Sequence, residues 1–342
     1  MHTNAKRTDI ARAAGVSEST VSRALANSPL ISAEIRQKVR EIAAEFGYVP
    51  SRQAALFTKN KTCRLGFVVR SYKVFPSFSR PYYPSLLDGA VRGAEEHGYF
   101  VTIILDRKEK ACDLALLVKS REIDGLLITI PSMDDPRFDE LRSRNVPCVL
   151  VNDYRDGFNC VDGKPDAGMR KALEHSVSLG HRRIGFITGD MHYRNAIDRL
   201  AVFNRLAREF GIDSSTAEGN FSRTSGYRCA GKLLRDGNSP TLIMASCDRE
   251  AIGVIDYCRE HGLHVPGDVS VIGYDNLDPA SDVTPALSTV DNQVMKTGWE
   301  AARLLCEILE GQARPPVTRW LDTDFVIRQS IGPCKNQQRS SV

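Results

Sequence analysis

The sequence predicts a small three-helix head with a helix-turn-helix, followed by a hinge and a two-lobed α/β core built on doubly wound parallel sheets. Three observations lead to this fold class. Residues 8–25 read as two short helices around a tight turn, and residues 1–61 hold all of the excess positive charge. From residue 64 onward, short apolar strands alternate with helices in two successive sets, which is typical of layered α/β folds. Two such sets imply two lobes with a cleft between them.

The first two helices are predicted from their end signals and their apolar spacing. Thr8 is expected to cap the first helix, Gly15 to end it, and Ser17 to cap the second. The positions expected to face inward are Ile10, Ala13, Ala14, Val21, Ala24 and Leu25. The positions left facing outward on the second helix are Glu18, Ser19, Ser22 and Arg23. Short polar groups and one arginine suit a helix laid in the DNA major groove, although an ordinary helical hairpin would show similar spacing.

A third helix and the local charge favour the nucleic-acid interpretation of this head. The helix is predicted to begin after its cap, Ser32, and to end at Gly47. Its apolar face is expected to contain Ile35, Val39, Ile42 and Phe46. Residues 1–61 contain ten basic and five acidic side chains, whereas residues 62–342 contain 36 basic and 37 acidic ones. Because the excess is confined to the head, a polyanionic partner for that segment is the simplest inference.

The composition is that of a globular protein without a membrane segment. The hydrophobic fraction is 42% and the charged fraction 26%, and no run of about 18 apolar residues occurs. The N-terminal residues lack the apolar segment of a secretory signal, so we expect a cytoplasmic location. Nine cysteines without a C-x-x-C pair favour reduced thiols over a disulfide framework or a zinc site. We expect no metal and no cofactor.

Residues 50–61 are predicted to form a hinge between the head and the core. Their composition favours a helix, but a helix of about eight residues is marginal alone in water because nucleation is costly. Docking on DNA, or on the same segment of a second subunit, would order it; a flexible tether is the alternative. Leu56 and Phe57 are unusual in an exposed tether, and Phe57 is a candidate wedge between base steps in the minor groove.

The core elements follow one another at short intervals. In the first set, strands are predicted at 64–69, 100–105, 125–130 and 148–151, and helices at 84–97, 111–122 and 136–144. In the second set, helices are predicted at 166–179, 199–210, 226–235 and 248–261, and strands at 184–188, 218–221, 241–245 and 269–273. A helix at 297–310 and a segment at 317–327 complete the two lobes. Ligand sites are expected at the carboxyl ends of the strands.

Several segments of the chain carry a resemblance to a known family. They are Asp9–Arg23, Gly47–Pro50, Ile123–Gly125, Leu179–Gly185, Val265–Asp275 and Leu287–Val290. In this order and spacing, they resemble the LacI/GalR family of bacterial transcription regulators over nearly the full length. The resemblance implies a periplasmic-binding-protein-like core and a homodimer that reads palindromic operator DNA, with its affinity set by a small molecule in the cleft. It divides the chain into a head at 1–49, a hinge at 50–61, an N-lobe at 62–161 and 291–321, and a C-lobe at 162–290 and 322–342.

The resemblance assigns DNA contacts to the second helix and the hinge. The candidates are the base-reading positions Glu18, Ser19 and Arg23, the phosphate- or base-contacting positions Thr20 and Ser22, the cap Ser17, and the hinge residues Leu56 and Phe57. Arg23 is suited to the acceptors of guanine. Glu18 either accepts a hydrogen bond from a cytosine amino group or faces solvent. Phe57 matches the family's intercalating leucine, and whether Phe57 or Leu56 is the wedge stays open.

The resemblance also assigns effector contacts in the cleft. The matching positions are Tyr82, Tyr83, Asn152, Arg199, Phe221, Cys247, Asp248 and Asp275. Their mixture of charged groups and aromatic faces suits a polyhydroxylated or heterocyclic ligand, so a carbohydrate is expected first and a nucleobase second. Three of them have alternatives: Asp248 as a helix cap, Asp275 as the end of a strand, and Tyr82 as packing. Cys247 stands where the family commonly has asparagine, which removes a hydrogen-bonding amide.

Two other function classes compete with a transcription regulator. An enzyme is disfavoured because the sequence lacks the G-x-G-x-x-G, G-x-x-x-x-G-K-[ST], G-x-S-x-G and H-E-x-x-H patterns. A cytoplasmic ligand-binding protein without a DNA function is disfavoured by the basic head. The expected mechanism is linkage between effector and operator binding, with repression expected and activation left open. Neither the sign of the coupling nor the identity of the effector follows from the sequence.

Overall fold

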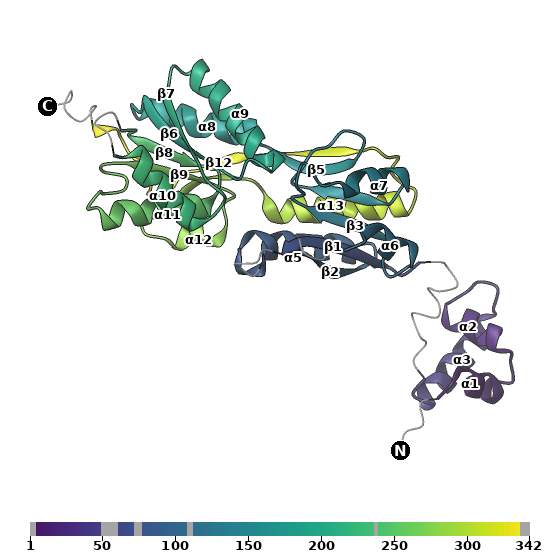
Figure 1. Cartoon of the computed structure of the whole chain (residues 1–342). Coiled ribbons are helices and arrows are strands. Elements are labelled where there is room, and N and C mark those ends of the chain that lie inside the picture. The colour runs from purple at the N-terminus through teal and green to yellow at the C-terminus, as the bar shows by residue number, and fades with distance from the viewer. Residues whose placement is uncertain (1–4, 49–60, 72–76, 108–111, 236–238, 336–342) are drawn as a thin grey trace. The chain divides into compact units, whose positions relative to one another are not determined.

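The computed structural model describes residues 5–48, 61–71, 77–107, 112–235 and 239–335 (Figure 1). The chain divides into two compact units, residues 1–62 and residues 63–342. The first unit contains a three-helix head and the second is a core of two α/β lobes, so the predicted head and core are confirmed. The predicted hinge at 50–61 lies outside the described residues, apart from Lys61. Within the described ranges, no helix combines the length and the apolar character needed to cross a membrane.

The head consists of α1 (Arg7–Ala14), α2 (Glu18–Leu25) and α3 (Ala33–Glu45). Each helix contributes an apolar stripe to a small core, in which Val21 and Val39 are fully buried. The hydroxyl groups of Ser17 and Ser32 accept hydrogen bonds from amides in the first turns of α2 and α3, which confirms both predicted caps. Phe46, expected on the buried face of α3, is 47% exposed because the helix ends at the residue before it.

Helix α1 differs from the prediction at its start and on its buried face. It begins one residue before Thr8, and Lys6 is its N-cap. The Lys6 N–H donates a hydrogen bond to the Asp9 carboxylate at 2.9 Å, so Thr8 lies inside the first turn and is not the cap. Ala11 is buried, whereas the predicted Ala13 is exposed.

The N-lobe is a six-stranded parallel sheet with helices on both faces (Figure 1). Its strands, in spatial order, are β11 (Thr318–Asp322), β5 (Asn159–Lys164), β4 (Cys148–Val151), β3 (Gly125–Thr129), β1 (Arg64–Ser71) and β2 (Phe100–Arg107). A 3₁₀ turn, η1, precedes α5 and spans Ser77–Ser79. One face is covered by α5 (Tyr82–Glu95) and α13 (Val294–Leu309), and the other by α6 (Leu114–Lys119) and α7 (Arg137–Ser143). Helices α5 and α13 approach so closely that a Cβ at Gly298 would lie 2.0 Å from the Leu86 carbonyl oxygen.

The C-lobe is a second six-stranded sheet, with one antiparallel strand at its edge. Its strands, in spatial order, are β12 (Asp324–Val326), β10 (Ser288–Asp291), β9 (Ser270–Tyr274), β8 (Leu242–Ala245), β6 (Arg183–Thr188) and β7 (Asp213–Glu218). One face is covered by α8 (Pro165–Ser178) and α9 (Arg194–Glu209), and the other by α10 (Arg223–Leu233), α11 (Asp248–Glu260) and α12 (Asp278–Asp282). The chain passes between the lobes after β5, after β10 and after β11.

The sequence-based prediction misses three core elements and misplaces one. It does not contain β5, β10 or α12, and it puts β7 at 218–221 instead of 213–218. Strand β7 lies at the edge of the sheet, and of its six residues only Ala217 is buried. An exposed edge strand needs no apolar run, so the pattern that locates buried parallel strands is absent there.

Candidate functional site

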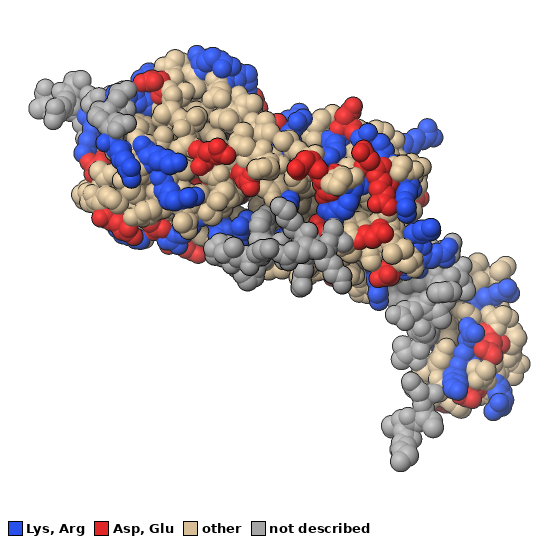
Figure 2. All heavy atoms as spheres, in the orientation of Figure 1, with Lys and Arg blue, Asp and Glu red and all other residues tan. Residues whose placement is uncertain are grey.

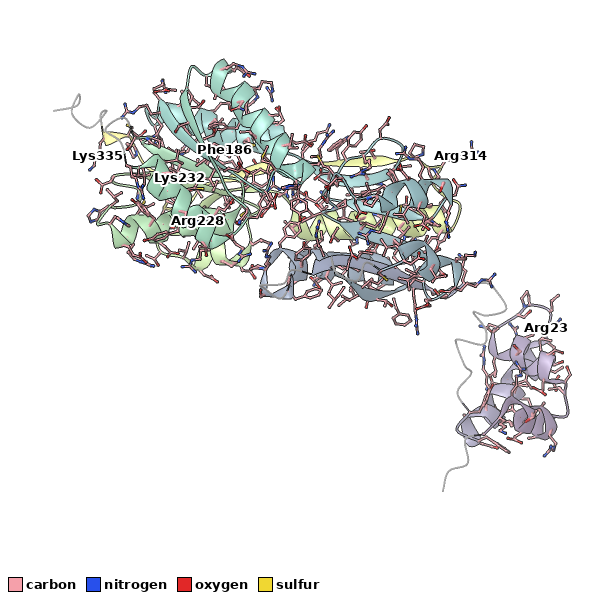
Figure 3. The ribbon with its side chains drawn as sticks, viewed as in Figure 1. Arg23, Phe186, Arg228, Lys232, Arg314 and Lys335 are labelled. Carbon is pink, nitrogen blue, oxygen red and sulfur yellow. The ribbon has the colours of Figure 1, made fainter. Side chains whose placement is uncertain are left out.

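The outward side of α2 is polar and accessible, as the sequence predicts. Ser19, Ser22 and Arg23 are exposed, and Arg23 is labelled in Figure 3. Figure 2 shows several lysine and arginine side chains, with a few acidic ones among them, on the visible face of the head. The Ser17 hydroxyl lies 2.8 Å from the Ser19 hydroxyl and 2.9 Å from the Thr20 hydroxyl, so the cap is part of a small hydroxyl cluster at the start of α2. Leu56 and Phe57 lie outside the described residues.

Glu18 pairs with a residue that the sequence analysis does not single out. Its Oε2 lies 3.0 Å from Nε of Arg7, the first residue of α1, and both side chains are about half exposed. The pair joins the starts of the two helices that form the helix-turn-helix. Eleven residues separate the partners, and nothing in the helical spacing of either helix indicates this contact.

All eight residues predicted for the cleft line a single pocket between the two lobes of the core. The N-lobe supplies Tyr82, Tyr83 and Asn152, and the C-lobe supplies Arg199, Phe221, Cys247, Asp248 and Asp275. Sequence reasoning missed six further lining residues, which are Arg80, Ile130, Tyr193, Asn195, Arg249 and Leu277.

The pocket forms where strands end and helices begin. Asn152 directly follows β4, Asp275 directly follows β9, and Phe221 lies shortly before α10. These three residues have positive φ angles of 56°, 117° and 62°, a region that non-glycine residues rarely adopt. Such strained backbone is often found at binding sites, where the surrounding structure holds it in place.

Arg199 and Asp275 form a buried ion pair inside the pocket. Nη2 of Arg199 lies 3.6 Å from Oδ1 of Asp275, and Nη1 donates a hydrogen bond to the Ser246 carbonyl at 2.5 Å. The guanidinium also lies over the ring of Tyr274, 3.8 Å from its centre. Burial raises the pKa of Asp275, and Arg199 opposes that shift. The pair can therefore offer donors and acceptors to a polar ligand at little further cost in desolvation.

Asp248 does not cap α11, so the capping alternative is wrong. Cys247 is the N-cap, and the Asp248 carboxylate accepts hydrogen bonds from the Thr289 hydroxyl and the Leu277 amide. It thereby ties the start of α11 to β10 and to the loop after β9. Burial, with the charge of Asp275 as the second cause, raises the pKa of Asp248.

Glu250 is a further buried carboxylate in the first turn of α11, and the sequence analysis does not single it out. It is fully buried and accepts hydrogen bonds from the Phe221 amide at 2.8 Å and the Asn220 amide at 3.0 Å. It also accepts from the hydroxyl groups of Ser225 and Ser246. Burial raises the pKa of Glu250 to about 7. An acidic residue in the first turn of a helix usually lies at the surface, where its charge interacts favourably with the helix dipole. The position of Glu250 in the sequence therefore does not indicate that its carboxylate is buried and hydrogen-bonded to a neighbouring loop.

The aromatic residues divide between the core and the pocket. Tyr83 is buried in the N-lobe core, and Tyr82 packs against that core while lining the pocket. Their rings meet edge to face with centres 5.6 Å apart. The packing contact of Tyr82 is therefore present, and its place in the pocket lining leaves effector binding as a prediction. Phe221 and Tyr193 add aromatic faces from the C-lobe.

Several buried polar atoms around the pocket lack a hydrogen-bond partner in the described part of the chain. They are Nδ2 of Asn152, Oδ1 of Asn195, Nη1 of Arg249 and Oδ1 of Asp275. Unsatisfied buried polar groups are costly and uncommon, so a cluster of them in one pocket indicates a site for a polar ligand. The set contains one donor from each lobe and two acceptors from the C-lobe. In the residues that the structure describes, no group of His, Cys, Asp and Glu side chains could hold a metal ion.

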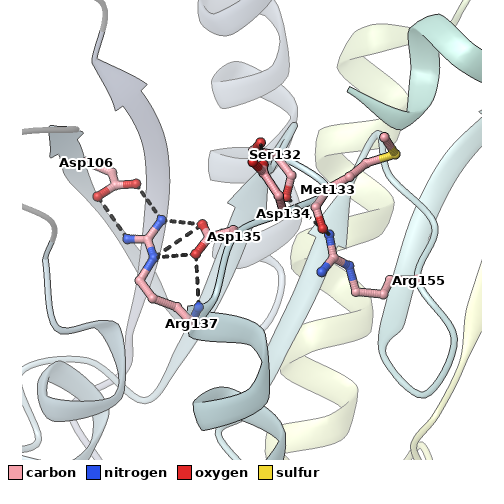
Figure 4. Close-up of polar contacts among 7 residues, drawn as sticks. All are labelled: Asp106, Ser132, Met133, Asp134, Asp135, Arg137 and Arg155. Atoms are coloured by element: carbon pink, nitrogen blue, oxygen red, sulfur yellow. Dashed lines mark hydrogen bonds and ion pairs between the residues drawn. The ribbon is translucent and has the colours of Figure 1, made fainter. Parts of the chain in front are cut away.

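The loop after β3 is held by polar contacts within the N-lobe (Figure 4) and also makes a hydrogen bond to the C-lobe. Arg137 binds both carboxylate oxygens of Asp106 at 2.9 and 2.7 Å and also binds Asp135, which fixes the end of this loop. Arg155 donates to the carbonyl oxygens of Ser132 and Met133. The Met133 amide in turn donates to the His192 carbonyl of the C-lobe at 3.2 Å. This hydrogen-bonded N-lobe loop therefore contacts the C-lobe at the residue next to Tyr193, which lines the pocket.

Two family models match the chain. The model described as Bacterial regulatory proteins, lacI family, matches residues 8–51, and the Periplasmic binding protein-like domain matches residues 173–331. The HTH-type transcriptional regulator DegA of Bacillus subtilis (strain 168) is 32% identical over 336 residues, which cover 95% of this chain and 97% of DegA. The Lactose operon repressor of Escherichia coli (strain K12) is 29% identical over 312 residues, which cover 89% of this chain and 85% of that protein.

Solved structures show the same architecture. The Lac repressor dimer bound to operator and the anti-inducer ONPF aligns with a TM-score of 0.84 at 24% identity, over 96% of this chain and 100% of that chain. The transcriptional regulator CelR–cellobiose complex aligns with a TM-score of 0.72 at 26% identity, over the same shares of the two chains. The chain therefore belongs to the lacI family of bacterial regulatory proteins and is a DNA-binding transcriptional regulator with an effector-binding core, not an enzyme.

Proposed function

We propose that this protein is a cytoplasmic repressor whose homodimer binds a palindromic operator and whose operator affinity depends on a small effector in the cleft. The observation that carries the proposal is the combination, in one chain, of an exposed polar recognition helix with a pocket whose buried polar atoms lack protein partners. The name of the Lactose operon repressor supports repression, and the cellobiose of the CelR complex supports a carbohydrate effector. A nucleobase is the second effector class.

In this proposal, the residues of α2 differ in the part of the DNA that they contact. Arg23 is exposed and reads the acceptors of guanine, and Glu18 and Ser19 face neighbouring base edges. Thr20 and Ser22 contact the phosphate backbone or base edges at the same surface. Ser17, which is engaged in capping, contributes mainly by fixing the start of the helix.

The cleft residues also have two roles in this proposal: some contact the effector, and the others position those contacts. Tyr82, Asn152, Arg199, Phe221 and Asp275 contact the effector in this proposal, because each lines the pocket and offers a ring face or a polar group. The remaining candidates, Tyr83, Cys247 and Asp248, also line the pocket and position those contacts, because Tyr83 packs in the N-lobe core, Cys247 caps α11, and the Asp248 carboxylate is held by hydrogen bonds.

The proposed mechanism is linkage between the two ligands. An effector that contacts both lobes favours one relative arrangement of them, and the hinges of the dimer carry that preference to the heads. Because the coupling is thermodynamic, the effector changes operator affinity by the same factor as the operator changes effector affinity.

The test is selection of bound genomic fragments by the purified protein, followed by gel-shift titration of the enriched sequence. We expect a palindromic sequence to be enriched. Arg23→Ala is expected to weaken its binding about tenfold or more, because a good arginine–guanine pair contributes about 1–3 kcal/mol of discrimination. Arg228→Ala, which removes an exposed arginine of α10 in the core, is the matched control (Figure 3). No enrichment over random competitor at moderate ionic strength, with or without metabolites, would exclude the proposed function.

A further inference from the structure

Two arginines that the family resemblance does not assign line the cleft from opposite lobes. Arg80 lies two residues before α5 in the N-lobe, and Arg249 is the second residue of α11 in the C-lobe. Both line the same pocket as Arg199. The pocket therefore contains three guanidinium groups, against the two carboxylates of Asp248 and Asp275.

The carboxylates around Arg249 are engaged by other groups. Asp248 accepts hydrogen bonds from β10 and from the loop after β9, and Glu250 accepts them from the loop before α10. Asp275 forms its ion pair with Arg199. In the described part of the chain, Nη1 of Arg249 is buried and has no hydrogen-bond partner. Asp248 and Arg249 both line the cleft, but hydrogen bonds within the protein engage the Asp248 carboxylate, whereas Nη1 of Arg249 has no such partner in the described part of the chain.

Arg80 and Arg249 also repel one another. Burial, followed by the charge of Arg80, lowers the pKa of Arg249. A guanidinium that is partly withdrawn from water is stabilised by an anion, and its planar fork matches the oxygens of a carboxylate or a phosphate. The amides in the first turn of α11 add positive potential at the same place.

We propose that the effector carries a carboxylate or phosphate group, which Arg80 and Arg249 bind from the two lobes. The remaining polar part of the effector then faces Asn152, Arg199 and Asp275. This inference rests on the proposed effector role of the cleft and narrows the ligand class from carbohydrates in general to acidic or phosphorylated ones. Because the two arginines belong to different lobes, an anion held by both favours the arrangement in which the lobes are close together.

The test uses the full-length protein and three probes: inorganic phosphate, gluconate and glucose, at matched ionic strength. Thermal unfolding and titration calorimetry are expected to show binding of phosphate, gluconate or both. Arg249→Gln is expected to weaken the anion's affinity about tenfold or more, since a hydrogen bond to a charged group is lost. Arg228→Gln removes an equal charge from α10 and is expected to change the affinity less than about twofold.

The relative affinities of phosphate and gluconate distinguish a phosphorylated effector from a carboxylated one, and binding of either that depends on Arg249 supports the proposal. Equal anion binding by the wild type and Arg249→Gln overturns it, as does the absence of any response to both anions. Arg80→Gln supplies the same comparison if Arg249→Gln fails to fold. Glucose binding that Arg249→Gln retains would overturn the anionic class while leaving the effector role of the cleft in place. Operator binding, measured in parallel, reports on the DNA function separately.

Discussion

At the scale of single residues, the ion pair between Arg7 and Glu18 explains how α2 can carry a negatively charged side chain on the side proposed to face DNA. Their 3.0 Å contact is half exposed, so it adds at most about 1 kcal/mol to stability. Its larger effect is on charge, because Arg7 offsets a carboxylate that would otherwise repel phosphate. A carboxylate has acceptor sites beyond the one that Arg7 occupies, and these can accept from an amino group of a base.

Glu18→Gln is therefore expected to change both the strength and the selectivity of DNA binding. The variant releases Arg7 for a phosphate contact, so the slope of log affinity against log salt concentration should steepen by about one. Base preference at one position of each half-site should shift toward adenine, which glutamine pairs with bidentately. Gel-shift titrations over a salt series measure both effects, with Glu34→Gln in α3 as the control. An unchanged slope and an unchanged preference would mean that Glu18 faces solvent.

Asp162 gives a prediction about pH at the same scale. It is buried on β5, its Oδ1 accepts the Gly163 amide at 2.7 Å, and burial raises its pKa to about 7. Because the folded pKa exceeds the unfolded value of about 3.9, the contribution of Asp162 to stability is fully present below pH 4 and is lost as the pH rises through 7. Asp162→Asn keeps the acceptor oxygen and removes the titration. We expect it to raise the free energy of unfolding at pH 8 by a few kcal/mol and to leave it nearly unchanged at pH 4, as measured by urea unfolding. A constant difference between these pH values would contradict the buried ionisation.

At the scale of elements, the sequence predicts the strands whose side chains are buried, because burial imposes a recognisable apolar pattern. It does not locate exposed strands, which lack that pattern. Strand β4 is predicted with its observed bounds, Cys148–Val151, because all four of its side chains are buried. The polar edge strand β7 is misplaced for the opposite reason. The cleft itself could be predicted, since parallel strands bring their carboxyl ends to one edge of each sheet.

The orientation of side chains within those elements could not be predicted. Asp248, Arg249 and Glu250 follow one another in the first turn of α11, yet only the first two line the cleft, and Glu250 turns away from it to accept the amides of the loop before α10. Which of three consecutive charged residues lines a pocket depends on the partners that neighbouring loops supply. Arg7 is a similar case, because its partner belongs to a different helix. Local spacing contains no information about either set of contacts.

At the scale of the whole molecule, the proposed homodimer needs a surface that joins two cores. Strand β2 is the edge of the N-lobe sheet and exposes Phe100, Ile103 and Leu105, which are 57%, 46% and 46% accessible. An apolar edge strand with this exposure is a liability for a monomer and a natural site for association. A palindromic operator also requires two heads held together, because the second half-site is then bound at a high effective concentration.

Ile103→Lys is therefore expected to dissociate the dimer, so that the two half-sites of the operator are no longer bound by one joined pair of heads. A buried lysine in such an interface costs several kcal/mol of desolvation, so sedimentation should show a monomer at micromolar concentration. Affinity for the full palindrome should fall by about 100-fold or more, whereas binding to an isolated half-site should be unchanged, because the head keeps its fold and its charge. Ile327→Lys makes the same substitution at a C-lobe position that is 55% exposed and serves as the control. A dimeric Ile103→Lys protein with full operator affinity would exclude the β2 edge as the interface, and a wild type that sediments as a monomer at these concentrations would exclude the dimer itself.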